Sequence, residues 1–151
     1  MTEEVKRNYL EINTLQDLKE GNKASRHYSL NLINPNNFQL NKFFYKNIGK
    51  KHKWEDRLAW SEEKWINYVS NKNIQTYILK YKDDLVGFFE LIYHPEKNER
   101  EIAYLGILEE YQNKKLGSYL LSEAIKKSFQ NNVKRVWVHT CSLDHKNALN
   151  N

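Results

Sequence analysis

The chain has 151 residues, a net charge of +5, a pI of about 9.1 and 13% aromatic residues. This length suits one domain with one core, and the aromatic content indicates a packed globule rather than a disordered chain. No apolar run is long enough to span a membrane, and the charged N-terminus contains no apolar signal core. We therefore expect a single domain over residues 1–151, located in the cytoplasm, with no membrane partner.

Positive charge is spread along the whole chain, and its one dense run, residues 50–53, is short. Because net charge by itself speaks to solubility and non-specific binding, nucleic acid is not expected as the main ligand, although a basic interaction protein stays as an alternative. The single cysteine, Cys141, excludes an intramolecular disulfide and a cysteine-cluster zinc site. It is compatible with a reducing compartment.

The first half of the chain predicts two strands and two helices. Residues 7–12 and 28–33 are candidate strands. Pro35 stands where a helix could begin, and an apolar stripe with helical spacing follows over residues 38–48. Ser61 is a good N-cap for a second helix, because the two glutamates after it suit a first helical turn.

The second half predicts an antiparallel hairpin followed by a strand–helix–strand unit. Residues 75–81 and 85–93 alternate like strands around a polar turn. Residues 94–100 form another polar turn, and the strand, helix and strand follow over 101–107, 116–129 and 133–140. Such a unit favours a parallel crossover. The expected fold class is therefore α/β, a mixed sheet with helices packed on it.

The loop over residues 111–119 reads Tyr-Gln-Asn-Lys-Lys-Leu-Gly-Ser-Tyr and joins the strand to the helix. The first turn of a helix has free N–H groups, and the helix dipole favours anions there. A polar, glycine-containing loop at this point predicts a site for a phosphorylated cofactor.

Three segments resemble the GNAT N-acetyltransferases, and most closely a bacterial branch of that family. They are Glu-Ile-Ala-Tyr-Leu-Gly-Ile at 101–107, the loop ending in Leu116-Gly117, and Val-Trp-Val-His-Thr-Cys-Ser-Leu-Asp-His at 136–145. The tryptophan-rich residues 54–65 are similar to that branch too, so the resemblance covers about residues 54–149. It implies a GNAT-like fold, in which an antiparallel hairpin leads into a splayed parallel strand pair. It also implies transfer of acetyl from acetyl-CoA to a primary amine of a small-molecule or peptide acceptor.

The resemblance also implies where acetyl-CoA would bind. The pantetheine arm would enter the gap between the splayed strands, and the N–H of Ile107 or Leu108 would polarise the thioester. The pyrophosphate would rest on the loop before the helix. The expected cofactor-binding residues are Gly106, Ile107, Leu108, Gln112, Asn113, Lys114, Lys115, Leu116, Gly117 and Ser118.

Two positions carry the main questions about this site. In the family signature Arg/Gln-x-x-Gly-x-Gly/Ala, Gln112 and Gly117 match, whereas Lys115 replaces a glycine that lets the backbone approach the phosphates closely. Glu101 is the candidate catalytic residue, either as the base for the amine or as a relay to it. The alternative interpretation of Glu101 is an exposed carboxylate at a strand end.

The resemblance also concerns the end of the chain. The family's usual thiolate acid is a tyrosine four residues after the alanine that corresponds to Ala148, which would be position 152. The last two strands of the fold would follow it as well, so we expect a C-terminally incomplete domain. The strand at 133–140 would then be an open edge that invites pairing with another chain, for example in a homodimer. An acetyl-CoA-binding module without turnover is therefore the alternative to an enzyme.

The remaining candidates have simpler interpretations. Cys141 could be a nucleophile beside His139 or His145, but a thiol at a strand end is more often a buried small hydrophobe. The histidines and Asp144 fit no zinc pattern, so no metal is expected, and Asp144 suits an N-cap for a terminal helix. Aromatic residues mainly supply buried area, which favours packing over an acceptor pocket for three tryptophans: Trp54, Trp60 and Trp65.

Overall fold

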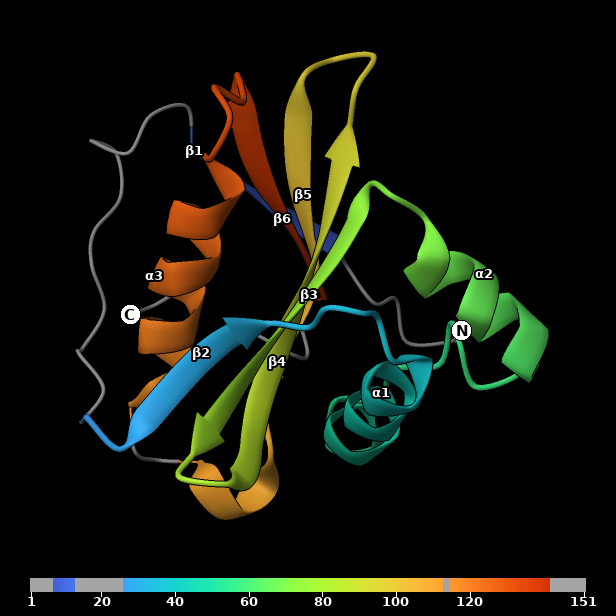
Figure 1. Ribbon diagram of the computed structural model, residues 1–151, viewed down its shortest axis with the longest axis vertical. Coiled ribbons are helices and arrows are strands. Elements are labelled where there is room, and N and C mark those ends of the chain that lie inside the picture. The colour runs from blue at the N-terminus through green and yellow to red at the C-terminus, as the bar shows by residue number, and fades with distance from the viewer. Residues whose placement is uncertain (1–6, 13–25, 113–114, 142–151) are drawn as a thin grey trace, which may run out of the picture.

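The computed structural model describes residues 7–12, 26–112 and 115–141. Within these residues a six-stranded sheet carries helices α1 and α2 on one face and α3 on the other (Figure 1). The strand order is β1-β6-β5-β4-β3-β2. The elements are β1 (Arg7–Ile12), β2 (Tyr28–Leu32), α1 (Phe38–His52), α2 (Glu62–Ser70), β3 (Ile74–Tyr81), β4 (Asp84–His94), β5 (Glu99–Ile107), the 3-10 turn η2 (Glu109–Tyr111), α3 (Leu116–Ser128) and β6 (Arg135–Cys141). The predicted mixed sheet with flanking helices is confirmed, and the helix expected from Asp144 lies outside the described residues.

Capping side chains set where the first two helices begin. The Asn37 side chain accepts a hydrogen bond of 3.0 Å from the Gln39 N–H, and α1 begins at Phe38. The predicted start at Pro35 was wrong, because the residue that satisfies a free N–H of the first turn decides where the helix starts. Ser61 caps α2 as predicted, since its hydroxyl accepts from the Lys64 N–H at 3.2 Å.

The hairpin between β4 and β5 is tighter than the sequence indicated. β4 runs on to His94 and β5 begins at Glu99, so that these two residues are paired across the strands. The turn between them closes with a hydrogen bond of 3.2 Å from the Lys97 N–H to the His94 carbonyl. Asn98 adopts a left-handed φ of 54°, which asparagine tolerates better than most residues. The longer strands bring His94 into the sheet.

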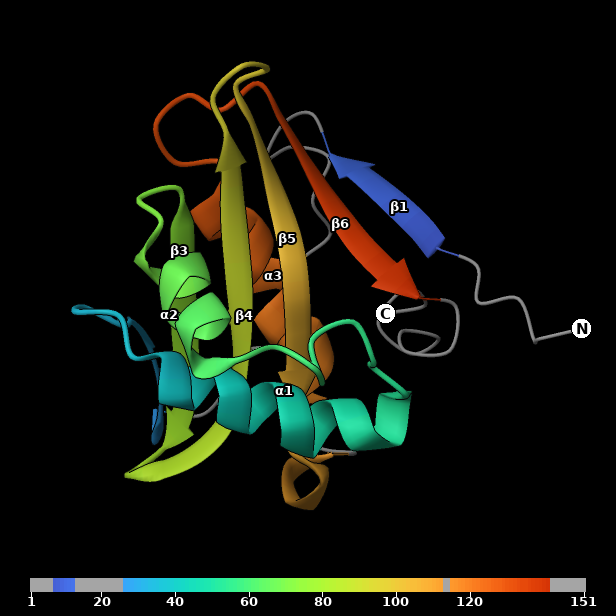
Figure 2. The same cartoon turned by 90° about the vertical axis from the view of Figure 1, so that its right-hand side faces the viewer.

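The parallel pair β5 and β6 separates halfway along β5. Pairing covers Glu99–Ile102 against Arg135–Val138, whereas β5 itself continues to Ile107. A bulge lies at the point of separation: Glu90 faces Tyr104 and Leu91 faces Ile102, which leaves Ala103 as the extra residue on β5. Bulges bend a strand and increase its twist, and Figure 2 shows β5 and β6 diverging. The predicted splayed strand pair is confirmed.

The outer edge of β6 is covered by β1. The two strands pair antiparallel, from Arg7 with Cys141 to Ile12 with Val136. The expected open edge along residues 133–140 was therefore wrong, because the first strand of the chain supplies the backbone partners that an edge lacks. The edge through which a homodimer was expected is thus already paired within the chain.

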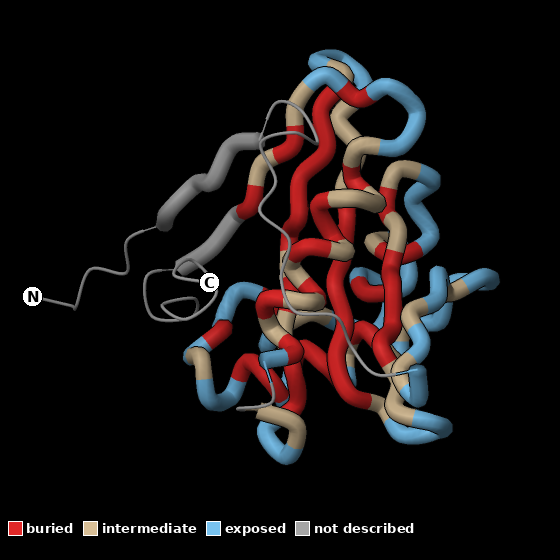
Figure 3. Tube along the Cα trace, turned by 90° about the vertical axis from the view of Figure 1, so that its left-hand side faces the viewer, coloured by how far each residue is buried: buried red, intermediate tan, exposed pale blue. Residues whose placement is uncertain are grey.

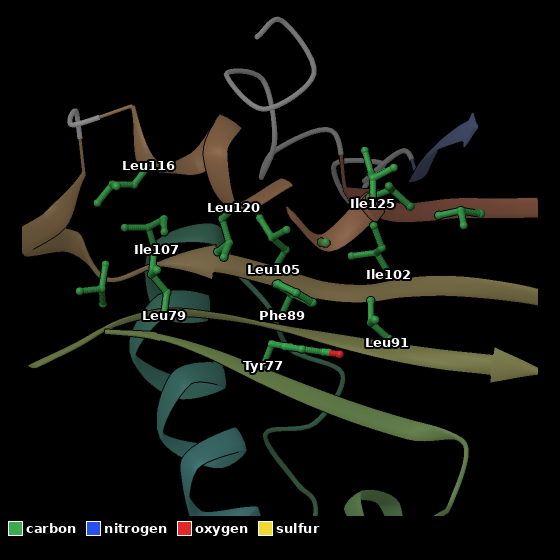
Figure 4. Close-up of a cluster of buried hydrophobic side chains, with 14 of the residues drawn as sticks. Tyr77, Leu79, Phe89, Leu91, Ile102, Leu105, Ile107, Leu116, Leu120 and Ile125 are labelled. Carbon is green, nitrogen blue, oxygen red and sulfur yellow. The ribbon is translucent and has the colours of Figure 1, made fainter. Parts of the chain in front are cut away.

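Each face of the sheet has its own core. Under α3, mostly aliphatic side chains from α3, β3, β4, β5 and β6 form a continuous apolar cluster that also contains Tyr77 and Phe89, and most of it is shown in Figure 4. Under α1 and α2 the core is aromatic, with Phe44 stacked on Phe88. Buried residues run along the central strands between these layers (Figure 3). Trp54 and Trp65 are buried in the aromatic core, and Trp60 packs against Trp65, which agrees with the packing interpretation.

Gly106 lets α1 approach β5. A Cβ at this position would lie 2.6 Å from Cγ2 of Ile48 on α1, a distance that would force the helix away. The reason for glycine at position 106 is therefore close packing of helix on strand. The sequence suggested instead that cofactor pairing involves this residue.

Candidate active site

The end of β5 presents backbone groups to the gap left by β6. The Leu108 N–H donates to the Val86 carbonyl at 2.8 Å, and Ile107 faces Gly87 in the next register position. In an antiparallel ladder, residues with hydrogen bonds across the pair alternate with residues whose groups point away from it. The Ile107 N–H and carbonyl therefore point away from β4, on the side where β6 has diverged. Of the two predicted thioester donors, Leu108 is engaged with β4, while Ile107 faces the gap.

The polar loop connects the end of β5 to α3. The Gln112 side chain reaches back and donates to the Ile107 carbonyl at 3.0 Å. Leu116 anchors the start of α3 in the core, and the Ser118 hydroxyl makes a long contact of 3.4 Å with the Lys115 carbonyl. These predicted residues are thus gathered at one end of β5 and the beginning of α3. Asn113 and Lys114 lie outside the described residues.

Lys115 adopts a conformation that explains why the family signature has glycine there. Its φ and ψ are 60° and 22°, in the left-handed region, and it is the N-cap of α3 without a side-chain capping bond. That region costs an ordinary L-residue roughly 1 kcal/mol or more relative to glycine. The sequence argument invoked close approach of the phosphates, whereas the structure adds a backbone reason. Two residues later, a Cβ on Gly117 would meet nothing within 4 Å, so the surface over this first turn is open.

Glu101 lies at the last part of β5 that is still paired with β6. His94 on β4 approaches it, with 3.0 Å between His94 Nε2 and Glu101 Oε1. The His94 ring stacks on Trp137 of β6, with a centroid distance of 5.8 Å and an interplanar angle of 16°. The three side chains come from adjacent strands, and they lie on the sheet face opposite α3. Glu101 is buried, with 10% of its side chain exposed, whereas the His94 side chain is 30% exposed. The alternative interpretation of Glu101 as an exposed carboxylate at a strand end was therefore wrong, because β5 begins two residues earlier and the His94 and Trp137 rings lie beside the carboxylate.

A second carboxylate, Glu90, lies on the same face but is fully buried. It accepts hydrogen bonds from Arg57 at 2.9 Å, Tyr68 at 2.8 Å and Asn41 at 2.8 Å. Asn41 also donates to the Thr76 hydroxyl at 2.8 Å. We call these residues the Glu90 network. It joins α1, the loop before α2, α2 itself, β3 and β4.

Aromatic rings surround the guanidinium of Arg57. Its Cζ lies within 6 Å of the rings of Tyr45, Trp60, Trp65, Tyr68 and Tyr104. Burial opposes the charge of Arg57, but the neighbouring Glu90 raises the pKa of the guanidinium overall. Burial, followed by the charge of Glu90, raises the pKa of Tyr68 well above its usual value. Tyr68 therefore stays a hydrogen-bond donor.

Tyr104 connects the Glu90 network to the surface of β5. It lies one residue past the bulge, and its hydroxyl donates to Asp56 at 3.3 Å. Burial raises the pKa of Tyr104, so its hydroxyl stays protonated. Tyr104 and Asp56 thus form a polar end to the aromatic core beside the splayed strands.

Other candidates from the sequence do not join this site in the described structure. The side chains of His139 and Cys141, together with Asp144 and His145, lie outside the described part. In residues 26–112 and 115–138, no three His, Cys, Asp or Glu side chains come together as a metal site would require. No described helix is long and apolar enough to cross a bilayer.

Sequence reasoning missed the roles of His94 and Glu90. Glu90 is a lone carboxylate in the apolar run of residues 85–93, a signal that it must be paired when buried. Its partner Arg57 is 33 positions away, so the sequence does not show the pairing. The sequence places His94 in the polar turn predicted over residues 94–100. Only the observed strand length brings it beside Glu101.

Comparison with known proteins gives the family. The family model described as "Acetyltransferase (GNAT) family" matches residues 35–150. The chain therefore belongs to the GNAT acetyltransferase family. No functionally curated protein sequence matches it.

Solved structures share the fold at low sequence identity. A GCN5-related N-acetyltransferase from Kribbella flavida is 13% identical with a TM-score of 0.62, and the alignment covers 91% of this chain but only 49% of that one. An aminoglycoside acetyltransferase from an uncultured soil metagenomic sample, in complex with sisomicin, is 12% identical with a TM-score of 0.65 and coverages of 82% and 84%. Spermidine N-acetyltransferase from Vibrio cholerae is 16% identical with a TM-score of 0.58 and coverages of 77% and 71%. The chain spans about half the length of the first of these proteins.

Proposed function

We propose that this protein is a cytoplasmic enzyme that transfers an acetyl group from acetyl-CoA to a primary amine. The observation that carries this proposal is the separation of β5 from β6 directly beside the beginning of α3. Because of this separation, the backbone N–H and carbonyl of Ile107 face the gap, and a single loop connects Ile107 to the N-terminus of α3. Membership of the GNAT acetyltransferase family supports the same reaction class.

The residues present suit a ligand that has amides at one end and phosphates at the other. The Ile107 N–H can donate to the cofactor in the gap, while the Leu108 N–H is already used by Val86. At the start of α3 the free N–H groups and the helix dipole favour an anion. The open surface at Gly117 gives that anion room to approach. Lys115 adds a positive charge at the same end of the site.

Glu101 is the residue that we propose as the base. An amine must lose a proton before it can attack a thioester, and a carboxylate within reach performs this step in general-base catalysis. Glu101 precedes the point where the strands part, and its partner His94 is partly exposed. The Ile107 N–H is the proposed donor to the oxygen on which negative charge develops.

The surroundings of this site favour a cationic acceptor amine. Glu101 and Glu96 both approach His94, and Asp56 accepts a hydrogen bond from Tyr104, three residues further along β5, while Arg57 is paired with Glu90. Structural relatives that carry the same fold include acetyltransferases named for aminoglycosides and for spermidine, and both kinds of compound carry more than one amino group. We therefore propose a small molecule or peptide with more than one amino group as the acceptor.

Isothermal titration with acetyl-CoA, followed by a thiol-release assay over a panel of amines, tests this proposal. We expect saturable binding and release of CoA thiol that depends on the amine. Binding without thiol release for any amine would support the alternative, a cofactor-binding module. No binding heat at millimolar acetyl-CoA would exclude both and leave a basic interaction protein.

Two loop variants show whether the cofactor contacts the first turn of α3. Gly117→Ala fills the open surface and should weaken acetyl-CoA binding, although alanine favours the helix by roughly 0.5–1 kcal/mol. Lys115→Gly is the second loop variant, and it tests the backbone conformation at the N-cap of α3. It removes left-handed strain and should raise the free energy of unfolding by about 1 kcal/mol or less. Equal acetyl-CoA affinity for Gly117→Ala and the wild type would place the cofactor elsewhere.

A further inference from the structure

We propose that His94 and Trp137 position Glu101 for catalysis: His94 donates a hydrogen bond to one carboxylate oxygen, and Trp137 holds the His94 ring in place. This inference rests on the proposed function, because it assigns these two residues to the base of that reaction. Neither residue was expected in the site from the sequence.

The three side chains come from three neighbouring strands in a fixed register. Glu101 pairs with Ile92 on β4 and with Trp137 on β6, and His94 lies two residues beyond Ile92 on the same face. Diagonal neighbours in a sheet are within reach of aromatic side chains. Backbone pairing on both sides of β5 therefore sets the positions of His94 and Trp137 relative to Glu101.

The chemistry of the contact fixes the proton on His94. An ionised carboxylate only accepts hydrogen bonds, so a contact of 3.0 Å between Nε2 and Oε1 requires a proton on Nε2. The other ring nitrogen, Nδ1, lies 3.8 Å from Glu96 Oε1, at the exposed turn between β4 and β5. The nearly parallel stack on Trp137 opposes rotation of the ring away from Glu101. One oxygen of Glu101 is thereby held, and its rotamer with it.

A fixed rotamer matters for a base because proton transfer depends on position. The acceptor ammonium would give one proton to the Glu101 carboxylate, and the resulting amine would attack the thioester carbon. The C–S bond then breaks, CoA leaves as the thiolate, and the second proton lost by the nitrogen reaches that thiolate through solvent to give the CoA thiol. The protonated Glu101 returns its proton to solvent. Misplacement of a reacting group by about 1 Å costs on the order of 100-fold in rate. Loss of the His94 contact should therefore reduce turnover without removing the base.

A neighbouring ion pair provides the matched control. Glu99 and Arg135 join β5 to β6, with 3.1 Å between Arg135 Nη1 and Glu99 Oε1, whereas His94 and Glu101 join β4 to β5. The exposure of the two pairs is similar, and Glu99 lies two residues before Glu101 on the shared strand. If cross-strand contacts in this region only stabilise the sheet, Arg135→Gln and His94→Ala should behave alike.

The test compares wild type, His94→Ala, His94→Gln and Arg135→Gln in the thiol-release assay, with the best amine of the panel. We expect His94→Ala to lower kcat by about 10- to 100-fold, with the KM for acetyl-CoA and the melting temperature close to those of Arg135→Gln. His94→Gln retains an N–H donor and should recover most of the loss. Trp137→Phe, which keeps a ring for stacking, should retain more activity than Trp137→Ala.

Three outcomes would overturn the inference. A kcat for His94→Ala equal to that of Arg135→Gln would show that the contact is structural, while leaving the proposed function intact. Equal kcat values for His94→Gln and His94→Ala would show that hydrogen-bond donation to Glu101 does not contribute to turnover. A wild-type protein that releases no thiol with any amine overturns the proposed function, and this inference falls with it.

Discussion

Two glutamates lie on the same face of the sheet, and their surroundings differ in almost every respect. Glu90 is completely buried and accepts from three other side chains, one of which is the guanidinium of Arg57. Glu101 is buried too, but it lies near the turn between β4 and β5 and contacts the partly exposed His94. The comparison shows that a carboxylate in the same sheet can serve the fold or the chemistry, depending on what surrounds it.

The difference follows from the free energy of burying a charge. A buried carboxylate is expensive unless its partners replace the lost water, and removing one partner leaves the other charge uncompensated. Glu90 has such partners, and a proton on it would break the pairing with Arg57. Glu101 instead lies beside His94, next to the point where β5 and β6 separate. We therefore assign Glu90 to stability and Glu101 to proton transfer.

The largest expected effect is on turnover, from Glu101→Gln. The amide keeps the shape of the side chain and a hydrogen-bonding oxygen but cannot take a proton. We expect kcat to fall by about 100-fold or more, with acetyl-CoA affinity and the free energy of unfolding near those of the wild type. Steady-state kinetics with the best amine, together with calorimetric titration, measure the two quantities. Wild-type kcat in this variant would refute the assignment of Glu101 as base.

The next effect is on stability, from Arg57→Met. Breaking a buried ion pair costs about 3–5 kcal/mol, because the remaining charge stays buried, whereas replacing both partners is often close to neutral. We expect that loss for Arg57→Met in urea denaturation and a clearly smaller loss for the double variant Arg57→Met with Glu90→Gln. Additive losses would mean that the two residues stabilise the fold independently.

A smaller effect is expected from Tyr68→Phe, which removes one donor from Glu90. Leaving a buried acceptor short of one hydrogen bond costs about 1–3 kcal/mol. Burial and Glu90 raise the pKa of Tyr68 in the folded state, so the folded protein keeps this proton at a pH where the unfolded chain loses it. The corresponding stability is present below pH of about 10 and is lost as the pH rises above it.

Urea denaturation of wild type and Tyr68→Phe at pH 8 and pH 10.5 measures this dependence. Other tyrosines, Tyr45 and Tyr104 among them, also have raised pKa values, so only the difference between the two proteins reports on Tyr68. We expect the difference in free energy of unfolding to shrink at the higher pH. A constant difference would show that Tyr68 does not titrate differently in the folded state.

The sequence predicted the parts of the fold that depend on local patterns. Alternation identified the central strands, and Ser61 identified the beginning of α2, because these signals come from neighbouring residues. The loop at residues 111–119 was recognised from its place between a strand and a helix. The left-handed backbone of Lys115 was not, since no neighbouring residue reveals φ.

Contacts between residues far apart in the chain could not be predicted from the sequence. Glu90 meets Asn41 across 49 positions and Arg57 across 33, and β1 reaches β6 from the other end of the chain. The bulge at Ala103 could not be predicted either, because no residue type around it signals an extra residue in the strand. Glu101 was a candidate from the resemblance to the family, but its contact with His94 came only with the register of β4 and β5.

The most direct test is a backbone-amide NMR titration of the protein with acetyl-CoA. The account predicts that chemical shifts change at Ile107 and over the first turn of α3, while the amides of Arg57 and Glu90 stay unchanged. Shifts centred on the Glu90 network, with none at Ile107, would contradict the placement of the cofactor between β5 and β6.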